Sequence, residues 1–254
     1  MGRSDGAQDG FGEDVFAARQ ASAAGELLLA IRRDGGAGEQ LGRRGDRESN
    51  RLIVEAIRAT YPTDSILSEE AADDSGRLSA DRVWIVDPLD GTREFSEPSR
   101  SDWAVHVALW SEQRIVAAAV AVPARGVLLS TADPSRPRPS TSSAPRLLVS
   151  RSRPPAMASS VAQLIGGVLV PMGSAGAKTA AVVLGEADAY LHAGGQYEWD
   201  SAAPAGIAAA AGLHVSRVNG DPLRYNQSDP MLPDLLICTR ELAEPILKAV
   251  AQSA

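Results

Sequence analysis

The chain has 254 residues, 44% hydrophobic and 4% aromatic, with a formal net charge of −7. Its length allows one large domain or two modest domains with a full core. The acidic balance argues against a nucleic-acid polymer as partner, because binding one needs a basic surface. The single cysteine, Cys238, lies in an apolar run. We therefore expect a buried, inert thiol and a cytoplasmic protein without internal disulfides.

Two features of the sequence argue against a secretory signal and a membrane span. Residues 1–14 are polar, Gly-rich and acidic, and they lack the apolar stretch of a secretory signal. A membrane-spanning helix needs about 18 or more consecutive apolar residues, and no window approaches that length. We therefore expect a protein without a membrane partner.

The first half of the chain is predicted to form two helices and a set of strands. Apolar side chains recur at helical spacing over 15–31 and 47–60, and the segment 38–45 between them is predicted to be a loop. The strand that begins at Val83 should stop at Pro88, which cannot donate a hydrogen bond to a sheet. The predicted strands of this half, of which the third and fourth form a hairpin, are 65–68, 83–86, 103–110, 115–123 and 127–130.

A change of composition separates the second half from the first. Residues 132–145 hold four prolines among Ser, Thr and Arg, which is typical of an exposed linker. We predict an N-terminal α+β sub-domain over 1–137 and a C-terminal α/β sub-domain over 138–254. Strands are predicted at 147–149, 168–172, 187–191, around Val215 and at 235–238, and helices at 156–165, 175–184, 200–211 and 241–251.

Two carboxylates stand where one of the predicted strands ends. Asp87 and Asp90 follow the run 83–86, and Gly91-Thr92 comes next, where a helix could begin. Carboxylate oxygens are ligands that Mg²⁺ prefers, and the free N–H groups at a helix start bind anions such as phosphate. An Asp-Pro followed by an Asp-Gly is also a common turn, so this stretch alone leaves a plain turn open as an alternative.

Two further acidic positions could complete a metal site. Glu69-Glu70 ends the predicted strand 65–68, and its plain alternative is a solvated loop. Asp200 follows Trp199 at the start of an Ala-rich helix, where an N-cap or first-turn acid would stabilise the helix by itself. If these acids converge with the pair described above, one metal site draws ligands from both halves of the chain.

Four separated pieces of the sequence occur in the order found in one enzyme superfamily. They are Asp46, Glu69-Glu70, Asp87-Pro88-Leu89-Asp90-Gly91-Thr92 and Trp199-Asp200. Over residues 13–251 the chain thereby resembles the Mg²⁺-dependent, lithium-sensitive phosphatases, which include inositol monophosphatases, fructose-1,6-bisphosphatases and bisphosphate nucleotidases. Three further pieces resemble the CysQ-type 3′(2′),5′-bisphosphate nucleotidases in particular: Arg93-Glu94-Phe95, Ser150-Arg151-Ser152-Arg153-Pro154 and Gly173-Ser174.

The resemblance implies a fold and a set of site residues. The implied fold is an α/β layered sandwich of αβαβα architecture with two sub-domains. The implied ligands of two Mg²⁺ ions, with a third ion as an option, are Glu69, Asp87, the Leu89 carbonyl, Asp90 and Asp200. Thr92, with Glu69 or Asp46, would orient the attacking water. Phosphate contacts are implied for Gly91, Thr92, Ser174, Lys178 and His192.

The same resemblance implies a reaction. It is the hydrolysis of the 3′-phosphate of 3′-phosphoadenosine 5′-phosphate, or of its sulfated relative, by metal-activated water. The products would be phosphate with AMP or adenosine 5′-phosphosulfate, which would place a monomeric or homodimeric enzyme in sulfur assimilation. Inositol 1-phosphate and fructose 1,6-bisphosphate stay open as substrates, because the chemistry is the same.

Three positions depart from the family pattern. Ala193 stands where inositol monophosphatases carry a Glu that contacts substrate, which counts against inositol phosphate. His192 stands where nucleotidases often carry an Arg. Arg43 replaces a frequent Thr, which weakens the water-orienting role of Asp46. His106, in a predicted strand, is expected in a core or surface role rather than in catalysis.

Two rival interpretations come from other functional classes. Haloacid-dehalogenase-type phosphatases also use an acidic Asp-Gly-Thr motif with an aspartyl nucleophile, but their acids are two residues apart, whereas Asp87 and Asp90 are three apart. The non-enzymatic alternative is a catalytically silent protein that binds a nucleotide or sugar phosphate. Mg²⁺-dependent release of phosphate would distinguish it from an enzyme.

Overall fold

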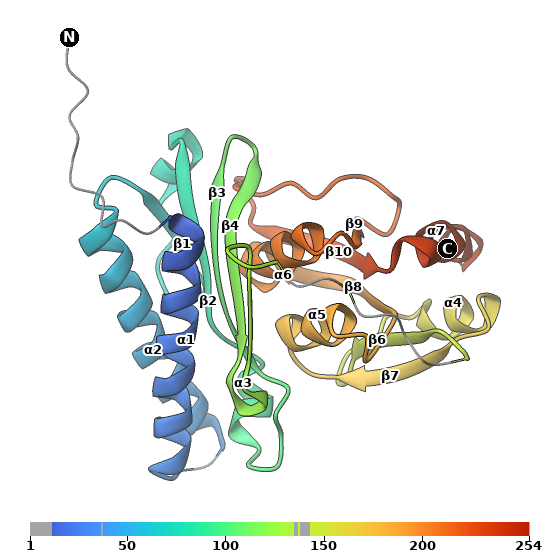
Figure 1. Ribbon diagram of the computed structural model, residues 1–254, viewed down its shortest axis with the longest axis horizontal. Helices are drawn as coiled ribbons and strands as arrows, with labels where there is room; N and C mark the ends of the chain where they lie inside the picture. The colour runs from blue at the N-terminus through green and yellow to red at the C-terminus, as the bar shows by residue number, and fades with distance from the viewer. Residues whose placement is uncertain (1–11, 37, 135–136, 138–142, 254) are drawn as a thin grey trace.

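The computed structural model describes residues 12–36, 38–134, 137 and 143–253, which form alternating layers of helix and sheet (Figure 1). The α-helices are α1 (Glu13–Arg33), α2 (Gly38–Thr60), α3 (Thr92–Ser96), α4 (Ala158–Leu164), α5 (Ala175–Val183), α6 (Glu198–Ala210) and α7 (Arg240–Ser253). In Figure 1, α1 and α2 cover the outer face of a first sheet, α5 and α6 lie between that sheet and a second one, and α4 and α7 cover the far face. The predicted α/β layered sandwich is confirmed.

The first sheet carries the strands of the first half in the order β1-β2-β3-β4-β5. These strands are β1 (Ser65–Ser68), β2 (Arg82–Asp90), β3 (Ala104–Ser111), β4 (Arg114–Val122) and β5 (Val127–Ser130). β1 and β2 are parallel, and all other neighbours in this sheet are antiparallel. The predicted hairpin is confirmed as β3 and β4.

The prediction that this strand stops at Pro88 was wrong, because β2 continues to Asp90. Asp87 pairs with His106 of β3, whereas Asp90 pairs with Ala104. Three steps along β2 therefore match two steps along β3, and β2 carries one extra residue, a β-bulge. The proline is tolerated because it lies within this bulge, where the regular hydrogen-bond ladder is interrupted.

The predicted loop at 38–45 was wrong, because these residues form the first turns of α2. Gly42 and Gly45 give this segment a loop-like composition, but they serve close packing. A Cβ on Gly42 would lie 2.5 Å from Thr92 Cγ2, and one on Gly45 would lie 3.0 Å from Leu89 Cδ2. The close approach of α2 to the end of β2 brings Asp46, the next residue of the helix, toward that strand end.

The second sheet has the strand order β7-β6-β8-β10-β9. Its strands are β6 (Arg146–Ser150), β7 (Val168–Met172), β8 (Ala189–Tyr197), β9 (His214–Ser216) and β10 (Met231–Cys238). The alternation of strands and helices predicted for this half is confirmed, although β8 and β10 are several residues longer than predicted. Cys238 is buried, as expected.

Small side chains join the two halves of the chain. α6 packs directly on the first sheet, where a Cβ on Gly206 would lie 2.8 Å from Ile115 Cγ2 and 2.9 Å from the Ala118 Cβ. The predicted linker 132–145 falls partly outside the described residues, and the division at 137/138 stays a prediction. Within the described ranges, no helix combines the length and the apolar character needed to cross a bilayer.

A buried arginine also connects the halves. Arg77, which follows β1, is 1% exposed. Its guanidinium donates to the carboxylate of Asp73, to Asn226 Oδ1 at 2.8 Å and to the Gln227 carbonyl at 2.9 Å. The N–H groups of Asn226 and Gln227 donate in turn to the carboxylate of Glu198 at 2.7 and 2.8 Å. Because Glu198 is the first residue of α6, this network fixes where that helix begins.

Arg77→Ala is expected to lower the free energy of unfolding by about 2–4 kcal/mol, because the buried Asn226 Oδ1 and the partly buried Gln227 carbonyl lose their donor. Urea denaturation monitored by circular dichroism measures this loss. The control is Arg114→Ala, which removes an exposed ion pair with Glu112 and should change stability by less than about 0.5 kcal/mol. Equal effects of the two substitutions would contradict a structural role for Arg77.

Candidate active site

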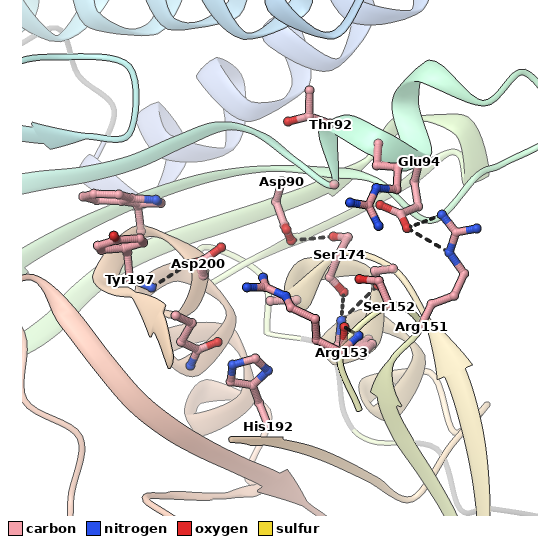
Figure 2. Close-up of a pocket in the computed structure, with 18 of the residues that line it drawn as sticks. Asp90, Thr92, Glu94, Arg151, Ser152, Arg153, Ser174, His192, Tyr197 and Asp200 are labelled. Atoms are coloured by element: carbon pink, nitrogen blue, oxygen red, sulfur yellow. Dashed lines mark hydrogen bonds and ion pairs between the residues drawn. The ribbon is translucent and has the colours of Figure 1, made fainter. Parts of the chain in front are cut away.

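A cavity of about 520 Å³ opens where the end of β2 meets the starts of α5 and α6 (Figure 2). Most of the predicted site residues line it: Glu69, Asp90, Gly91, Thr92, Ser174, Lys178, His192 and Asp200. Asp46, Asp87 and Leu89 lie behind the wall, and each contacts or approaches a residue that lines the cavity. The cavity therefore draws its walls from both halves of the chain.

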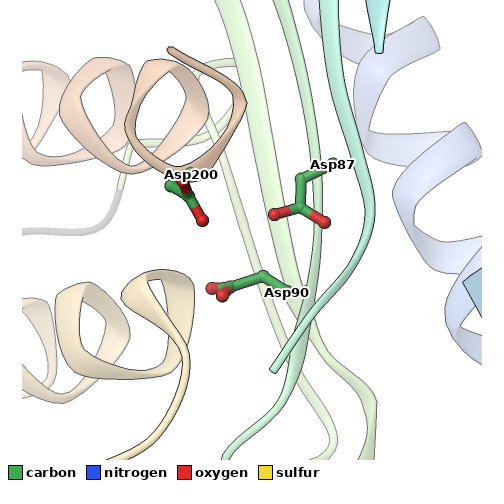
Figure 3. Close-up of side chains that lie close together, drawn as sticks. All are labelled: Asp87, Asp90 and Asp200. Atoms are coloured by element: carbon green, nitrogen blue, oxygen red, sulfur yellow. The ribbon is translucent and has the colours of Figure 1, made fainter. Parts of the chain in front are cut away.

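Three carboxylates meet at one end of this cavity (Figure 3). One oxygen each from Asp87, Asp90 and Asp200 lies within 4.8 Å of the other two. Asp87 and Asp90 are buried, with 1% and 8% exposure, and Asp200 is half-buried. Asp200 comes from α6 and the other two come from β2, so the predicted convergence of acids from both halves is present.

The bulge in β2 explains how Asp87 and Asp90 reach the same site. Side chains alternate along a regular strand, so residues three apart point to opposite faces. The extra residue reverses this alternation. Ser49 of α2 donates a 2.7 Å hydrogen bond to the Pro88 carbonyl, and the Leu89 N–H donates to Asp87 Oδ1 at 3.0 Å. These two bonds hold the bulge in place.

The start of α5 is hydrogen-bonded to Asp90. Asp90 Oδ2 accepts hydrogen bonds from Ser174 Oγ at 2.5 Å and from the Gly176 N–H at 2.9 Å. Burial by itself would raise the pKa of Asp90. His106, then Lys178 and the Ser174 hydroxyl, stabilise the charged form more strongly and lower this pKa to about 2. Asp90 is therefore an ionised oxygen donor with a fixed orientation.

Asp200 is confirmed as an acid of the first helical turn, and its role as a metal ligand stays a prediction that its position allows. Its carboxylate accepts a 2.6 Å hydrogen bond from the N–H of Tyr197, which stabilises the first turn of α6. The same carboxylate belongs to the acidic cluster. The helix start and the candidate metal site are therefore one structure.

Thr92 lies between two of the acceptors expected near the reacting water. Its hydroxyl is 3.4 Å from Asp46 Oδ1 and 3.2 Å from the Leu89 carbonyl. Gly91, the residue before it, has φ +89°, and a Cβ there would lie 3.3 Å from Ser174 Cβ. Glycine therefore suits this position on both conformational and steric grounds, and it keeps the start of α3 open to the cavity.

Burial and mutual repulsion raise the pKa values of the other acids around the cavity. Loss of hydration, then the charge of Glu70, raises the pKa of Asp46 to about 7. Loss of hydration, then the charges of other acids led by Asp200, raises the pKa of Glu69 to about 8. Burial is also the main cause that raises the pKa of Asp200 to about 6 and that of Asp87 well above its usual range. Acids crowded in this way are stabilised by a cation.

The donor set suits a hard divalent cation. Carboxylate and carbonyl oxygens are what Mg²⁺ takes, while sulfur ligands are absent because the chain's one cysteine is buried in β10. Asp87, Asp90 and Asp200, with Glu69 and the Leu89 carbonyl as further candidates, could supply those oxygens. The residues present therefore fit the implied metal.

Two residues predicted to contact phosphate, Lys178 and His192, lie within hydrogen-bond distance of backbone carbonyls of the protein itself. Lys178 is 4% exposed, and its ammonium donates to the Gly173 and Ser174 carbonyls at 3.1 and 2.7 Å. Burial lowers its pKa to about 8. His192 Nε2 lies 3.0 Å from the Gly195 carbonyl. Both side chains line the cavity, and Lys178 in addition fixes the loop before α5.

His106 is closer to the acids than its expected core or surface role suggested. It is fully buried, with Nδ1 3.1 Å from the Trp199 carbonyl and Nε2 3.2 Å from Asp90 Oδ2. Because a carbonyl only accepts, Nδ1 carries a proton. His106 thus spans from the start of α6 to the end of β2. The pairing of β2 with β3, which places His106 opposite Asp87, brings it there, and this register was not readable from the sequence.

The crowding of the acids predicts a pH dependence of stability. An unfolded carboxyl titrates near pH 4, whereas Asp46, Glu69 and Asp200 titrate near 7, 8 and 6 in the folded protein. Between about pH 4 and 8 the folded metal-free protein binds more protons than the unfolded chain, so its stability falls as pH rises. In EDTA the Tm should fall from pH 6 to 8.5, and Mg²⁺ should restore most of the loss at pH 8.5.

Thermal unfolding followed by circular dichroism checks this dependence. Asp200→Asn removes one of the crowded charges, and it should show a smaller fall over the same pH range. A Tm in EDTA that stays constant or rises between pH 6 and 8.5 would contradict the crowding of these acids.

Comparison with known proteins agrees with the motifs and the layers. The inositol monophosphatase family model matches residues 13–254. The chain is 52% identical over 240 residues to the 3′-phosphoadenosine 5′-phosphate phosphatase of Mycobacterium tuberculosis, covering 91% of this chain and 90% of that protein. It is 30% identical over 207 residues to the 3′(2′),5′-bisphosphate nucleotidase CysQ of Escherichia coli K12, covering 74% and 80%.

A solved structure gives the same picture. CysQ from Bacteroides thetaiotaomicron, a bacterial member of the inositol monophosphatase family, matches with a TM-score of 0.77 at 27% identity, covering 90% of this chain and 97% of that one. An inositol monophosphatase from Anabaena matches with a TM-score of 0.74 at 21% identity, which supports the fold alone. The resemblance inferred from the sequence is confirmed: this chain belongs to the inositol monophosphatase family.

Proposed function

We propose that the chain is a Mg²⁺-dependent phosphomonoesterase that hydrolyses the 3′-phosphate of 3′-phosphoadenosine 5′-phosphate to give AMP and phosphate. The observation that carries the proposal is the meeting of Asp87, Asp90 and Asp200 at one end of the cavity. The name of the M. tuberculosis relative supports the choice of substrate. The sulfated relative of this nucleotide would give adenosine 5′-phosphosulfate by the same chemistry.

The acids would hold two cations, as in other two-metal phosphatases. Asp87, Asp90 and Asp200 would hold one, and Glu69, Asp87 and the Leu89 carbonyl would hold the other. Bound there, the cations lower the pKa of a water and stabilise charge on the transferring phosphoryl group. The hydrogen bonds that fix Asp90 and Asp200 keep their oxygens oriented for this role.

Thr92 and Asp46 are suited to orient the attacking water. The Thr92 hydroxyl has one proton, which Asp46 or the Leu89 carbonyl can accept, and its lone pairs then accept a proton from the water. Asp46, with a pKa near 7, is suited to take that proton. The water oxygen bonds to phosphorus, the bond from phosphorus to the 3′ oxygen breaks, and the leaving oxygen takes a proton from a solvent water to become a hydroxyl. No phospho-enzyme forms.

The N–H groups of Gly91 and Thr92 would bind the transferred phosphate at the start of α3. The second phosphate requires another cation. Two arginines that line the cavity, Arg93 and Arg153, have no carboxylate partner in the part of the chain described above. Arg153 lies beside His192 (Figure 2), whose pKa is lowered by burial, then by the charge of Lys178 and then by that of Arg153. We assign the 5′-phosphate to Arg153.

A substrate panel tests the proposed function. Phosphate release is measured from 3′-phosphoadenosine 5′-phosphate, inositol 1-phosphate and fructose 1,6-bisphosphate, each with Mg²⁺, with EDTA, and with Mg²⁺ plus Li⁺. We expect the nucleotide to have the highest kcat/KM, EDTA to abolish turnover and Li⁺ to inhibit it. Asp90→Asn and Asp200→Asn should lower kcat at least about 100-fold, with the fold intact.

Three results of the panel would contradict the proposal. They are turnover in EDTA, a preference for either of the other substrates, and incorporation of phosphate into Asp87. The last would indicate an aspartyl nucleophile. The absence of any turnover would indicate a silent binding protein.

Arg153→Ala is expected to raise KM for 3′-phosphoadenosine 5′-phosphate about 10-fold, since it removes one charge-assisted contact. KM for 3′-AMP, which has no 5′-phosphate, should not change. Arg93→Ala is the matched comparison, because it removes the other arginine without a carboxylate partner from the same cavity. If Arg93→Ala rather than Arg153→Ala discriminates between the two nucleotides, the 5′-phosphate is assigned to the wrong arginine.

A further inference from the structure

We propose that the exposed ring of Tyr197 is the surface on which the substrate's base stacks, which makes Tyr197 a specificity-determining residue for nucleotides. The inference rests on the proposed function, because it assumes that the phosphate of the same ligand lies at the acidic cluster. It adds a binding site for an aromatic base beside that cluster, because the Tyr197 N–H donates to Asp200.

Tyr197 leaves about half of a large aromatic side chain in solvent. It is 47% exposed. The other exposed large apolar side chains of the described chain are Leu78, Leu128, Leu164, Val168 and Met231, and none of these lines the cavity, whereas Tyr197 does. Its exposure therefore coincides with the place where a ligand would bind.

Trp199 supports Tyr197 from one side. The two rings are stacked, with centroids 4.6 Å apart and planes 11° apart. Trp199 is half-buried and packs against the core between the two sheets. The indole of Trp199 thus covers one face of the Tyr197 ring. Because Tyr197 is 47% exposed, its other face can receive a flat group. A third ring would continue an existing stack.

The backbone holds this pair in a fixed relation to the acids. The Tyr197 N–H donates to Asp200 Oδ2 at 2.6 Å, so the aromatic ring belongs to the same turn as a proposed metal ligand. Glu198, between the two rings in sequence, donates its N–H to the Pro230 carbonyl at 2.8 Å and accepts two hydrogen bonds through its carboxylate. A pre-positioned ring loses little conformational entropy when a ligand binds.

The chemistry of the ring selects among phosphate esters. Every nucleobase has a flat π-face and stacks on aromatic side chains, whereas inositol and fructose have no such face. The cavity volume of about 520 Å³ lies within the range usual for small-ligand sites. Tyr197 therefore favours a nucleoside phosphate over a polyol phosphate without any hydrogen bond to the base. The preference requires an aromatic ring rather than a tyrosine hydroxyl.

The test compares ligands that differ only in the base. The Kd values of AMP and ribose 5-phosphate are measured by calorimetry in Mg²⁺ buffer, with KM for 3′-phosphoadenosine 5′-phosphate measured in parallel. The wild-type protein should bind AMP more tightly than ribose 5-phosphate. Tyr197→Ala should weaken AMP binding and raise KM about 5- to 150-fold, with ribose 5-phosphate binding unchanged. Tyr197→Phe should restore most of the difference.

Met231→Ala is the matched control. Met231 pairs with Tyr197 across β8 and β10 and is 52% exposed, but it does not line the cavity. This variant should bind both ligands as the wild type does. Unfolding curves confirm that each variant is folded.

The outcomes separate this inference from the proposed function. If Tyr197→Ala keeps the wild-type ratio of the two Kd values, or weakens both ligands equally, the stacking role is wrong even where the nucleotide is turned over. If the substrate panel shows no turnover of the nucleotide, the proposed function fails. A base-dependent Kd that is lost only in Tyr197→Ala would still support the stacking site.

Discussion

The mutual repulsion of carboxylates is the constraint on which the rest of the site depends. Asp87, Asp90 and Asp200 place oxygens within 4.8 Å of one another in a largely buried setting. Burial, and after it the nearby like charges, disfavour ionisation, and the raised pKa values of Asp87, Asp200 and Glu69 express this cost. A divalent cation bound among the ionised acids would offset their repulsion. The arrangement therefore suits metal binding better than a plain turn or helix cap.

Each wall of the cavity has its own structural origin. The bulge at Pro88 turns two acids of β2 to one side, and the start of α6 brings a third acid together with the stacked rings of Tyr197 and Trp199. The N–H groups at Gly91 lie near the acids, whereas Arg153 and the aromatic pair belong to the second half of the chain. One end of the cavity thus suits a phosphoryl group, and the walls from the second half suit the remainder of a nucleotide.

The sequence could predict what depends on local pattern. The helix 241–251 and the hairpin 103–123 were readable from periodicity and spacing, and the set of acidic motifs was identified by its resemblance to a known phosphatase superfamily. Features that depend on the approach of another element were not. Pro88 appeared to end a strand because a bulge is defined by its partner, and Gly42 appeared to belong to a loop although it packs against α3. His106 looked like a core residue because its contact with the acids needs the strand register.

The central claim is that acids from both halves of the chain share a cation. Crystals soaked in Mn²⁺ and phosphate, with anomalous difference maps, test it most directly. The account predicts a strong peak within bonding distance of Asp87, Asp90 and Asp200, and a second near Glu69 and the Leu89 carbonyl. Manganese bound elsewhere, or bound between the β2 acids with Asp200 turned away, would contradict it.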